Sequence, residues 1–562
     1  MKRSTSLLPG VLVAMLLSVG GSALAAEPGS SSDTSTDPAA IPETGLEFGS
    51  YELVPLLGDQ PPYAGPATPA SLGGVLVSEQ VDGLLDPRAR RVLARQGFVV
   101  VPADLRLFHQ AYEEQYYEGT PVFVTSDAAY HTWHLIFDKT LRDLELRLLL
   151  PTLEELVGGM LANARAQRRA LAGTGLADEA QRVVQLLQVA GAELGIPVGT
   201  LLPAAQAEKA LVDAHTEYTR SPLLGTLIDY SLFTPRGHYT RNADLTRYFT
   251  AMSVLGQTSF LLPGSVQSDE TVVEGVDGLR LALLSSRTLV GDPEMEGRWR
   301  RIYEPTAFLV GTGDDYTPFE LAEAVEATVA GGMADPLLVA DEATLEAVAD
   351  TLTAARPVRI DSERPSVRLM GTRFVIDSWV LDQMVYPNVG GEPLPERRFL
   401  ASPLDLAAAF GSEFALAVQD EAGETSYLHY PEQMEAMRTV LADRPDEAWG
   451  RTVYDAWLAA VEPMWLPHGD AFPDFMRSEA WTAKDHQAGF GSYAELKHDT
   501  ILYTKQFVGE MGAAPEEPRP EVRNWVEPDP VPFARLVAMA ELMRDGLVAR
   551  DLLTKASAEL LD

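Results

Sequence analysis

Four residues with metal-binding or acid–base side chains recur at helical spacing after Ser126. They are Asp127, His131, His134 and Asp138. In an α-helix, where successive residues turn by about 100°, these side chains fall within about 60° of one another. Two histidines one turn apart can bind a metal ion, or serve as an acid–base pair oriented by a carboxylate. The simpler alternative is that Asp127 caps the helix and the histidines bond backbone carbonyls.

The segment Gly491–Tyr503 carries related chemistry. Glu495, His498 and Asp499 share one helical face, and Glu-x-x-His is a spacing with which helical bundles hold metal ions. Ser492 and Glu495 also match a capping box, which predicts a helix start at Ser492 and gives Glu495 a purely structural role. Both interpretations of Glu495 stay open.

The two segments together supply a candidate site for a zinc-like divalent ion. Its predicted ligands are His131, His134, Glu495 and His498. The residues predicted to take part in catalysis are Asp127, Glu495 and Asp499, with Asp127 or Asp499 orienting a ligand and the metal activating water. The prediction requires the two helices to meet, which the spacing alone does not establish.

A loop before a third helix is rich in side chains that bind anions and hydroxyls. We expect Arg236, His238, Tyr239 and Arg241 to bind a carboxylate, a phosphate or a sugar hydroxyl. In so acidic a chain the alternative is that the arginines pair with internal carboxylates.

Two tryptophans precede the Glu495 segment and offer a carbohydrate-binding interpretation. Trp465 and Trp481 can stack on sugar rings, with Glu479 and Glu495 as a carboxylate pair for glycoside cleavage. Of these, Trp481 is the predicted ligand-binding residue. The alternative is that both tryptophans belong to the core.

Composition excludes several classes of protein. The 562 residues contain no cysteine, which rules out disulfides, cysteine nucleophiles and a lipid anchor on a cysteine. The net charge is 44 − 81 = −37, which argues against nucleic acid and anionic membranes as partners. HExxH, GxxxxGK, GxSxG, SxxK and GxGxxG are all missing from the sequence.

The N-terminus has the features of a Sec signal peptide. Lys2 and Arg3 are basic, Leu7–Val19 is largely apolar, and mostly small residues follow up to Ala26. We expect residues 1–25 to be removed and the mature protein to be periplasmic or extracellular. Its net charge would then be −39, because Lys2 and Arg3 are lost and the leader contains no acidic residue. Since no later segment is long and apolar enough to span a bilayer, we expect no stable membrane insertion after cleavage.

Residues 26–71 are polar and proline-containing, and they predict a disordered tether followed by an irregular surface segment. Residues 72–562 predict one large, mostly helical body of paired helices, in a toroid or a bundle. The predicted helices are 86–96, 103–117, 126–149, 152–172, 177–194, 203–219, 241–255, 275–290, 431–442, 449–461, 492–507 and 532–549. Short strands are predicted at 98–101, 122–125, 358–360 and 367–374. Loops at 256–273 and 386–402 are the predicted interruptions.

Several blocks of the chain resemble an uncharacterised bacterial family, the domain of unknown function 3160. They include FVTSDAAYHTWHLIFD, DYSLFTPRGHYTR, WRRIYEPTAFLVG, RLMGTRFVIDSWV and MRSEAWTAKDHQAGFGSYAELKHDTILYTKQ. They extend from about residue 100 to 550, so the resemblance implies one integral unit. It implies no reaction, cofactor or catalytic residue.

These observations favour an exported hydrolase, metal-dependent in its most specific form, acting on a cell-envelope or extracellular polymer such as a glycan or peptide. The expected groove is lined by the helices at 127–138 and 495–499 and the loop at 236–241. The alternative is a non-catalytic extracytoplasmic binding or scaffold protein whose polar clusters hold helices together.

Overall fold

The computed structural model describes residues 64, 85–100, 109–110, 112–113, 123–267, 271–360, 362–391, 396–505 and 525–553. In these residues helices predominate and strands are short, which confirms the mostly helical fold. All described helices belong to one compact unit. The predicted signal peptide, nearly all of the predicted tether and most of the predicted helix 103–117 lie outside the described residues.

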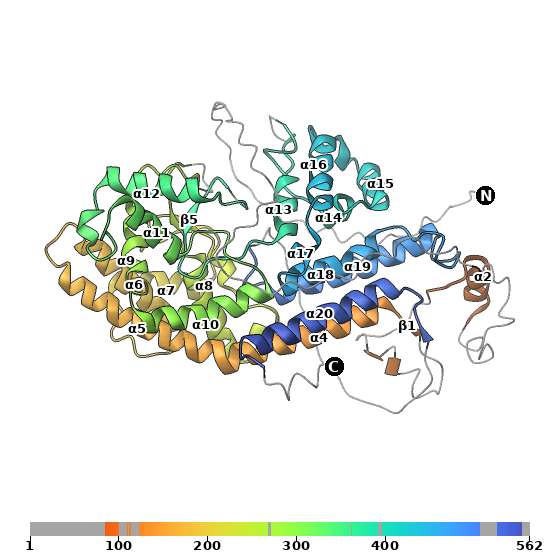
Figure 1. The fold of residues 1–562 in the computed structure, drawn as a ribbon, viewed down its shortest axis with the longest axis horizontal. Coiled ribbons are helices and arrows are strands. Elements are labelled where there is room, and N and C mark those ends of the chain that lie inside the picture. The colour runs from red at the N-terminus through yellow and green to blue at the C-terminus, as the bar shows by residue number, and fades with distance from the viewer. Residues whose placement is uncertain are drawn as a thin grey trace, which may run out of the picture. The chain divides into compact units, whose positions relative to one another are not determined.

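Helices follow one another closely along the chain (Figure 1). Those before residue 360 are α2 (Pro87–Gln96), α4 (Ser126–Leu144), the π-helix η1 (Glu145–Leu149), α5 (Leu150–Ala170), α6 (Ala177–Leu194), α7 (Pro203–Ala214), η2 (Tyr230–Phe233), η3 (Gly237–Thr240), α8 (Ala243–Gln257), α9 (Asp277–Ser286), α10 (Pro293–Leu309), α11 (Pro318–Thr328), η4 (Pro336–Leu338) and α12 (Glu342–Ala355). Those after it are α13 (Ile376–Gln383), α14 (Pro403–Ala409), α15 (Glu413–Glu421), η5 (Glu424–Ser426), α16 (Tyr430–Ala442), α17 (Asp446–Trp449), α18 (Val453–Val461), η6 (Glu462–Trp465), α19 (Glu479–Asp499) and α20 (Pro530–Ala549).

The described strands form three pairs, and each strand is two residues long. β1 (Phe123–Val124) pairs in parallel with β6 (Trp525–Val526), whereas β2 (Thr219–Arg220) with β3 (Leu227–Ile228), and β4 (Phe260–Leu261) with β5 (Ser366–Val367), are antiparallel. Residues 98–100 and 358–360 are not strands, so those two predictions are wrong.

One hydrophobic cluster runs through the described helices. It includes Leu153 of α5, Leu187 of α6, Trp457 of α18 and Met539 of α20, all almost completely buried. Because helices from both halves of the sequence share this cluster, apolar burial holds them as one body. In the described residues no helix is both long and apolar enough to cross a membrane.

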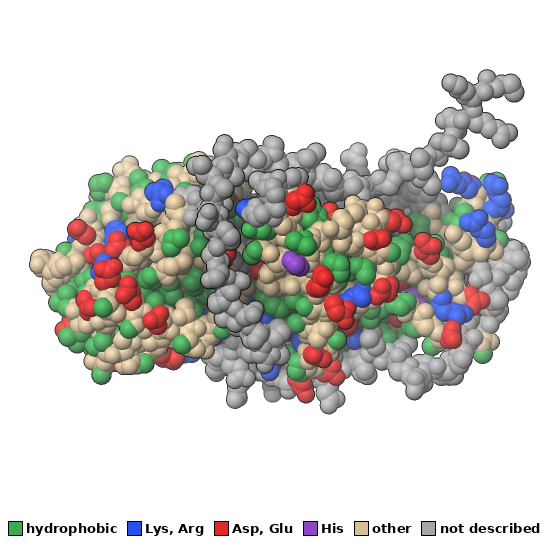
Figure 2. All heavy atoms as spheres, turned by 90° about the horizontal axis from the view of Figure 1, so that it is seen from above, with side chains coloured by type: hydrophobic (Ala, Val, Ile, Leu, Met, Phe, Trp, Pro, Cys, Tyr) green, Lys and Arg blue, Asp and Glu red, His purple; other side chains and the backbone are tan. Residues whose placement is uncertain are grey.

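Figure 2 shows acidic side chains scattered over one face of the molecule, with basic side chains gathered where α2 lies. The exposed arginines of α2 are Arg88, Arg90, Arg91 and Arg95. The surface is therefore not uniformly acidic despite the net charge.

The helix that carries Glu495 begins earlier than its capping-box pattern predicts. α19 starts at Glu479, and the side chain of Ser478 caps it by accepting a bond from the backbone of Trp481. Ser492 lies in the buried interior of the helix, where its hydroxyl accepts a bond of 2.8 Å from Trp457 Nε1. The predicted helix start at Ser492 and the capping-box interpretation of Glu495 are therefore wrong, whereas residues 492–499 are helical as predicted.

Packing explains why α19 runs through the predicted helix start. Gly489 lies inside the helix and is required by this packing. A Cβ at that position would lie 2.6 Å from Nε1 of Trp465, so only glycine lets the indole approach the helix.

A carboxylate from the far end of the sequence fixes the start of α4. Thr125 is the N-cap residue but its side chain makes no capping bond. Glu527 Oε2 instead accepts from the backbone N–H of Ser126 at 2.7 Å and from its hydroxyl at 3.0 Å. This bond and the β1–β6 pair join the C-terminal segment to α4, which runs beside α20 and α19 (Figure 1).

Candidate functional site

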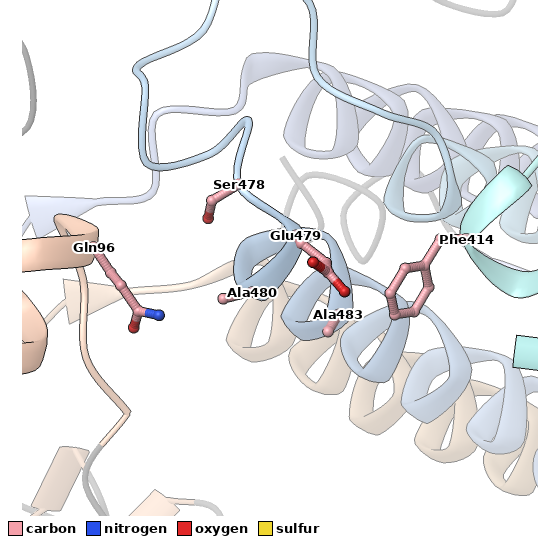
Figure 3. Close-up of a pocket in the computed structure, with 6 residues that line it drawn as sticks. All are labelled: Gln96, Phe414, Ser478, Glu479, Ala480 and Ala483. Atoms are coloured by element: carbon pink, nitrogen blue, oxygen red, sulfur yellow. The ribbon is translucent and has the colours of Figure 1, made fainter. Parts of the chain in front are cut away.

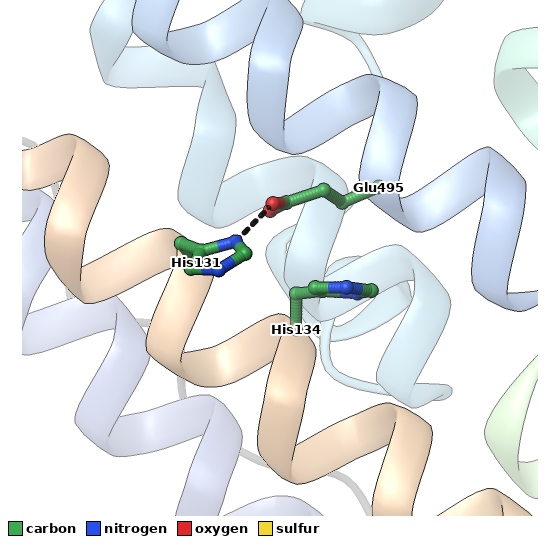
Figure 4. Close-up of side chains that lie close together, drawn as sticks. All are labelled: His131, His134 and Glu495. Carbon is green, nitrogen blue, oxygen red and sulfur yellow. Dashed lines mark hydrogen bonds and ion pairs between the residues drawn. The ribbon is translucent and has the colours of Figure 1, made fainter. Parts of the chain in front are cut away.

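Three of the four predicted metal ligands meet, two from α4 and one from α19. One ligand atom from each of His131, His134 and Glu495 lies within 4.8 Å of the other two (Figure 4). The closest pair is His131 Nδ1 and Glu495 Oε1, at 2.6 Å. All three side chains are partly exposed, so solvent reaches the group. Among the described residues this is the one group of three or more possible ligands that close together.

Helical periodicity explains why these side chains face each other. Trp133 and Phe137 of α4 are buried, and both rings pack edge-on against Trp457 of α18. His131 and His134 flank this buried face and therefore lie at the edge of the α4–α19 contact. Their position follows from burial of the aromatic residues beside them.

Asp499 orients one of the histidines. It is completely buried, and its Oδ2 lies 2.7 Å from His134 Nδ1. Burial disfavours charge on His134, but the bond to Asp499 and the charges of Asp499 and Glu495 outweigh it and raise the pKa of the imidazole. The carboxylate engages Nδ1, which leaves Nε2 of His134 as the atom for a metal.

His498 stands beside this group and is not part of it. Its Nδ1 lies 3.3 Å from Asp499 Oδ1, and its ring centroid lies 6.3 Å from that of His134. On the other side it faces η3, where a Cβ on Gly237 would lie 3.0 Å from His498 Nε2. The three segments predicted to line a groove therefore lie next to one another. They are the helices 127–138 and 495–499 and the loop 236–241, and His498 lies between α4 and η3.

Two histidines and a glutamate form a known ligand set for catalytic zinc and for other divalent transition metals. An ion with bonds of about 2.0–2.1 Å in tetrahedral geometry spaces its ligand atoms about 3.3 Å apart. The contact of 2.6 Å between His131 and Glu495 must therefore open by several tenths of an ångström when an ion binds. Rotation of two partly exposed side chains can provide this, so the residues fit a metal ion.

Side chains of the loop predicted to bind a ligand instead contact buried carboxylates of the protein itself. His238 lies between Asp138 and Glu145, with Nδ1 3.0 Å from the first and Nε2 2.8 Å from the second. The hydroxyl of Tyr239 donates to Glu145 at 2.6 Å. Both His238 and Tyr239 are buried and bonded to carboxylates, an internal role that the sequence offers as an alternative only for the arginines.

The two arginines of the loop differ. Arg236 is partly buried and donates to the carbonyl of Ser231 at 3.2 Å, and burial lowers the pKa of its guanidinium. Arg241 is largely exposed and lies 3.5 Å from Asp138. Arg241 is therefore the member of this set that a ligand in solution reaches most easily.

The pKa of His238 predicts a pH-dependent contribution to stability. Burial disfavours the imidazolium, but Glu145 and Asp138 outweigh it and raise the pKa from 6.5 to about 9. Since the folded pKa is above the unfolded one, the stabilisation is complete below about pH 6.5 and is lost as pH rises through 9. This group should lower the free energy of unfolding by about 2–3 kcal/mol between pH 6.5 and 9.5. Urea denaturation of wild type and His238→Gln measures the difference, and equal pH slopes would contradict the prediction.

The structure does not support carbohydrate stacking on the two tryptophans. Trp465 is 1% exposed and Trp481 is 3% exposed, so neither ring offers a face to a sugar. Glu479 and Glu495 lie sixteen residues apart on α19, which separates them by about 24 Å along its axis. Glycosidase carboxylates lie about 5–9.5 Å apart, so this pair cannot perform the predicted cleavage.

Asp127 is turned toward a different set of partners. Its carboxylate lies 3.5 Å from Lys484 Nζ, which also bonds both oxygens of Glu527 at 3.1 Å. Asp485 pairs with the same lysine and with His468. Asp127 therefore belongs to a charge cluster that secures the C-terminal segment, away from the three possible metal ligands.

Sequence reasoning missed Glu145, which joins α4 to η3. It stands within an apolar run, LELRLLL, and nothing local signals a buried acid. Pro151 does signal an irregular turn at this place, because its ring would clash with the carbonyl of Arg147 in a regular helix. The wider turn of η1 lies just before this proline.

The family model described as a protein of unknown function (DUF3160) matches residues 86–562. The chain belongs to this family. No curated protein and no solved structure matches it. The match covers every element that builds the site, including α4, η3 and α19, so the site lies wholly within the family's domain.

Proposed function

We propose that this protein is an exported, metal-dependent hydrolase that uses a divalent ion held by His131, His134 and Glu495. The observation that supports it is the approach of these three ligand atoms to within 4.8 Å across two helices. Three protein ligands leave at least one coordination position for water, as in catalytic zinc sites. A bound zinc-like ion would lower the pKa of that water and supply a nucleophile near neutral pH.

The surroundings suit this chemistry. Asp499 holds His134 by Nδ1, the usual arrangement behind a metal-binding histidine. His498, partly exposed and 6.3 Å from His134 between ring centroids, is placed to contact a substrate at the ion. Asp127 pairs with Lys484 and takes no part in this scheme.

The proposed substrate is a polymer of the cell envelope or extracellular medium, such as a glycan or peptide. This part rests on the signal peptide predicted from the sequence. The large negative charge of the chain disfavours strongly charged polyanions such as nucleic acid as substrates.

The first experiment measures metal in full-length protein purified without a histidine tag. We expect about one zinc-like ion per chain in wild type. Loss of two of three ligands should weaken binding at least about 100-fold in His131→Ala/His134→Ala. His429→Asn is the matched control, because His429 is the exposed N-cap residue of α16 and asparagine tolerates its positive φ of 65°.

The second experiment measures release of soluble fragments from dye-labelled peptidoglycan and from casein. Activity should disappear with a chelator, return with zinc and be absent from the double variant. A metal-free wild type that zinc does not stabilise against heat would overturn the proposal.

A scaffold role is the second candidate, and the direct contact of 2.6 Å between His131 and Glu495 favours it, since this contact joins α4 to α19 without an ion. It predicts that His131→Ala, which leaves the bond between His134 and Asp499 in place, lowers the melting temperature of metal-free protein without affecting any turnover. The hydrolase predicts that this variant loses turnover whether or not its melting temperature changes.

A further inference from the structure

Ser412 and His486 form a hydrogen-bonded pair outside the metal group. Ser412 Oγ lies 2.6 Å from His486 Nε2, and His486 Nδ1 lies 2.8 Å from the carbonyl oxygen of Thr482. A carbonyl only accepts, so Nδ1 carries the ring hydrogen and Nε2 presents its lone pair. Ser412 therefore donates to Nε2, which is the orientation of a serine nucleophile and its base, with a backbone carbonyl fixing the tautomer.

The surroundings keep this base neutral. His486 is 3% exposed, and burial lowers the pKa of its imidazole. A neutral imidazole can accept the proton of Ser412 at physiological pH. Ser412 is also the N-cap residue of α15, whose positive end favours negative charge developing next to Oγ.

A hollow of about 460 Å³ lies next to Phe414, a neighbour of the pair. It is lined by Gln96, Phe414, Ser478, Glu479, Ala480 and Ala483 (Figure 3). The ring of Phe414 packs on His486, with centroids 4.7 Å apart. Ser412 is 1% exposed, whereas Phe414 is partly exposed, lines the hollow and contacts His486, so movement of this ring is the route from the hollow toward the pair that we consider.

We propose that Ser412 and His486 are a second, metal-independent acyl-transfer site, covered by Phe414, for a small neutral ester or amide that enters the hollow. Ser412 Oγ attacks the carbonyl carbon while its proton passes to His486 Nε2. The tetrahedral intermediate then collapses, and the leaving group departs with that proton. Water attacks the acyl–serine, again giving a proton to His486, which returns it to Ser412 as the acid is released.

The test is labelling by a fluorophosphonate probe in chelator-treated, full-length protein, which keeps it independent of the proposed metal site. The serine oxygen bonds to phosphorus and fluoride leaves, so the label marks an activated serine. We expect one label per chain on the peptide that contains Ser412. His486→Ala should slow labelling at least about 100-fold, and Phe414→Ala should accelerate it about tenfold by uncovering the pair.

Ser402→Ala is the matched control for the capping role of Ser412. Ser402 caps α14, accepting from the backbone N–H of Leu404 at 3.1 Å, and it has no imidazole partner. Ser402→Ala should be labelled like wild type, whereas Ser412→Ala should not be labelled. No label on the Ser412 peptide in either wild type or folded Phe414→Ala would overturn the proposal, as would equal labelling of Ser412→Ala.

Discussion

Replacing Glu145 with alanine is expected to lower the free energy of unfolding by about 3–5 kcal/mol. Glu145 is 0% exposed and accepts hydrogen bonds from His238, Tyr239 and Tyr503 at 2.6–2.8 Å. Without it, two buried hydroxyls and an imidazolium lose their acceptor together. Each unsatisfied buried group costs about 1–3 kcal/mol, and the charged one costs more.

Urea denaturation at pH 7 measures this loss. Glu155→Ala is the matched control, because Glu155 is exposed and pairs only across the surface with Arg298 at 3.0 Å. That surface pair should contribute less than about 1 kcal/mol. If Glu145→Ala proves as mild as Glu155→Ala, the buried network does not hold η3 to α4.

The grouping of the possible metal ligands on each helix could be predicted because local rules govern it. His131 and His134 lie on one face of a helix in any fold that keeps α4 helical, and burial of Trp133 next to them fixes which way that face points. Glu495 lies on α19 for the same reason. What the spacing could not supply was the meeting of α4 and α19, which depends on packing between residues more than 350 positions apart in the chain.

The start of α19 was predicted wrongly because a tertiary contact overrides the local pattern. Ser492 and Glu495 matched a capping box, yet α19 continues through Gly489 and Gly491, and Trp465 packs where a side chain at Gly489 would lie. The tertiary contact outweighs the low helix propensity of glycine, about 1 kcal/mol per residue. Ser492, which matched an N-cap in the sequence, therefore lies in the middle of α19.

Caps and buried charges set by distant residues are invisible to local patterns. The start of α4 is capped by Glu527, 401 residues away, although Asp127 looked like a sufficient cap in sequence. His238 resembled a ligand-binding residue, and it is held by Asp138 and Glu145. In both cases the residue type indicated that a polar contact would form, but only the fold determined the partner.

Asp499→Asn is expected to weaken metal binding about 10- to 100-fold without removing any ligand. Asp499 Oδ2 lies 2.7 Å from His134 Nδ1, and only an acceptor there keeps the ring hydrogen on Nδ1. An asparagine amide can donate to Nδ1 instead, which moves the hydrogen to Nε2 and blocks the atom that would bind the ion. The change in shape is minimal, so the effect isolates the tautomer.

The measurement is the zinc dissociation constant, determined in competition with a chelator for wild type, Asp499→Asn and Asp127→Asn. Asp127 is the matched control, since it lies on the same helical face as His131 and His134 but pairs with Lys484 at 3.5 Å. Loss of its charge should change affinity less than about threefold, because a partly exposed carboxylate acts on the ion only through screened electrostatics. Equal losses in the two variants would show that negative charge near the helices, and not orientation of His134, governs binding. A loss confined to Asp499→Asn would assign the orienting role to this carboxylate alone.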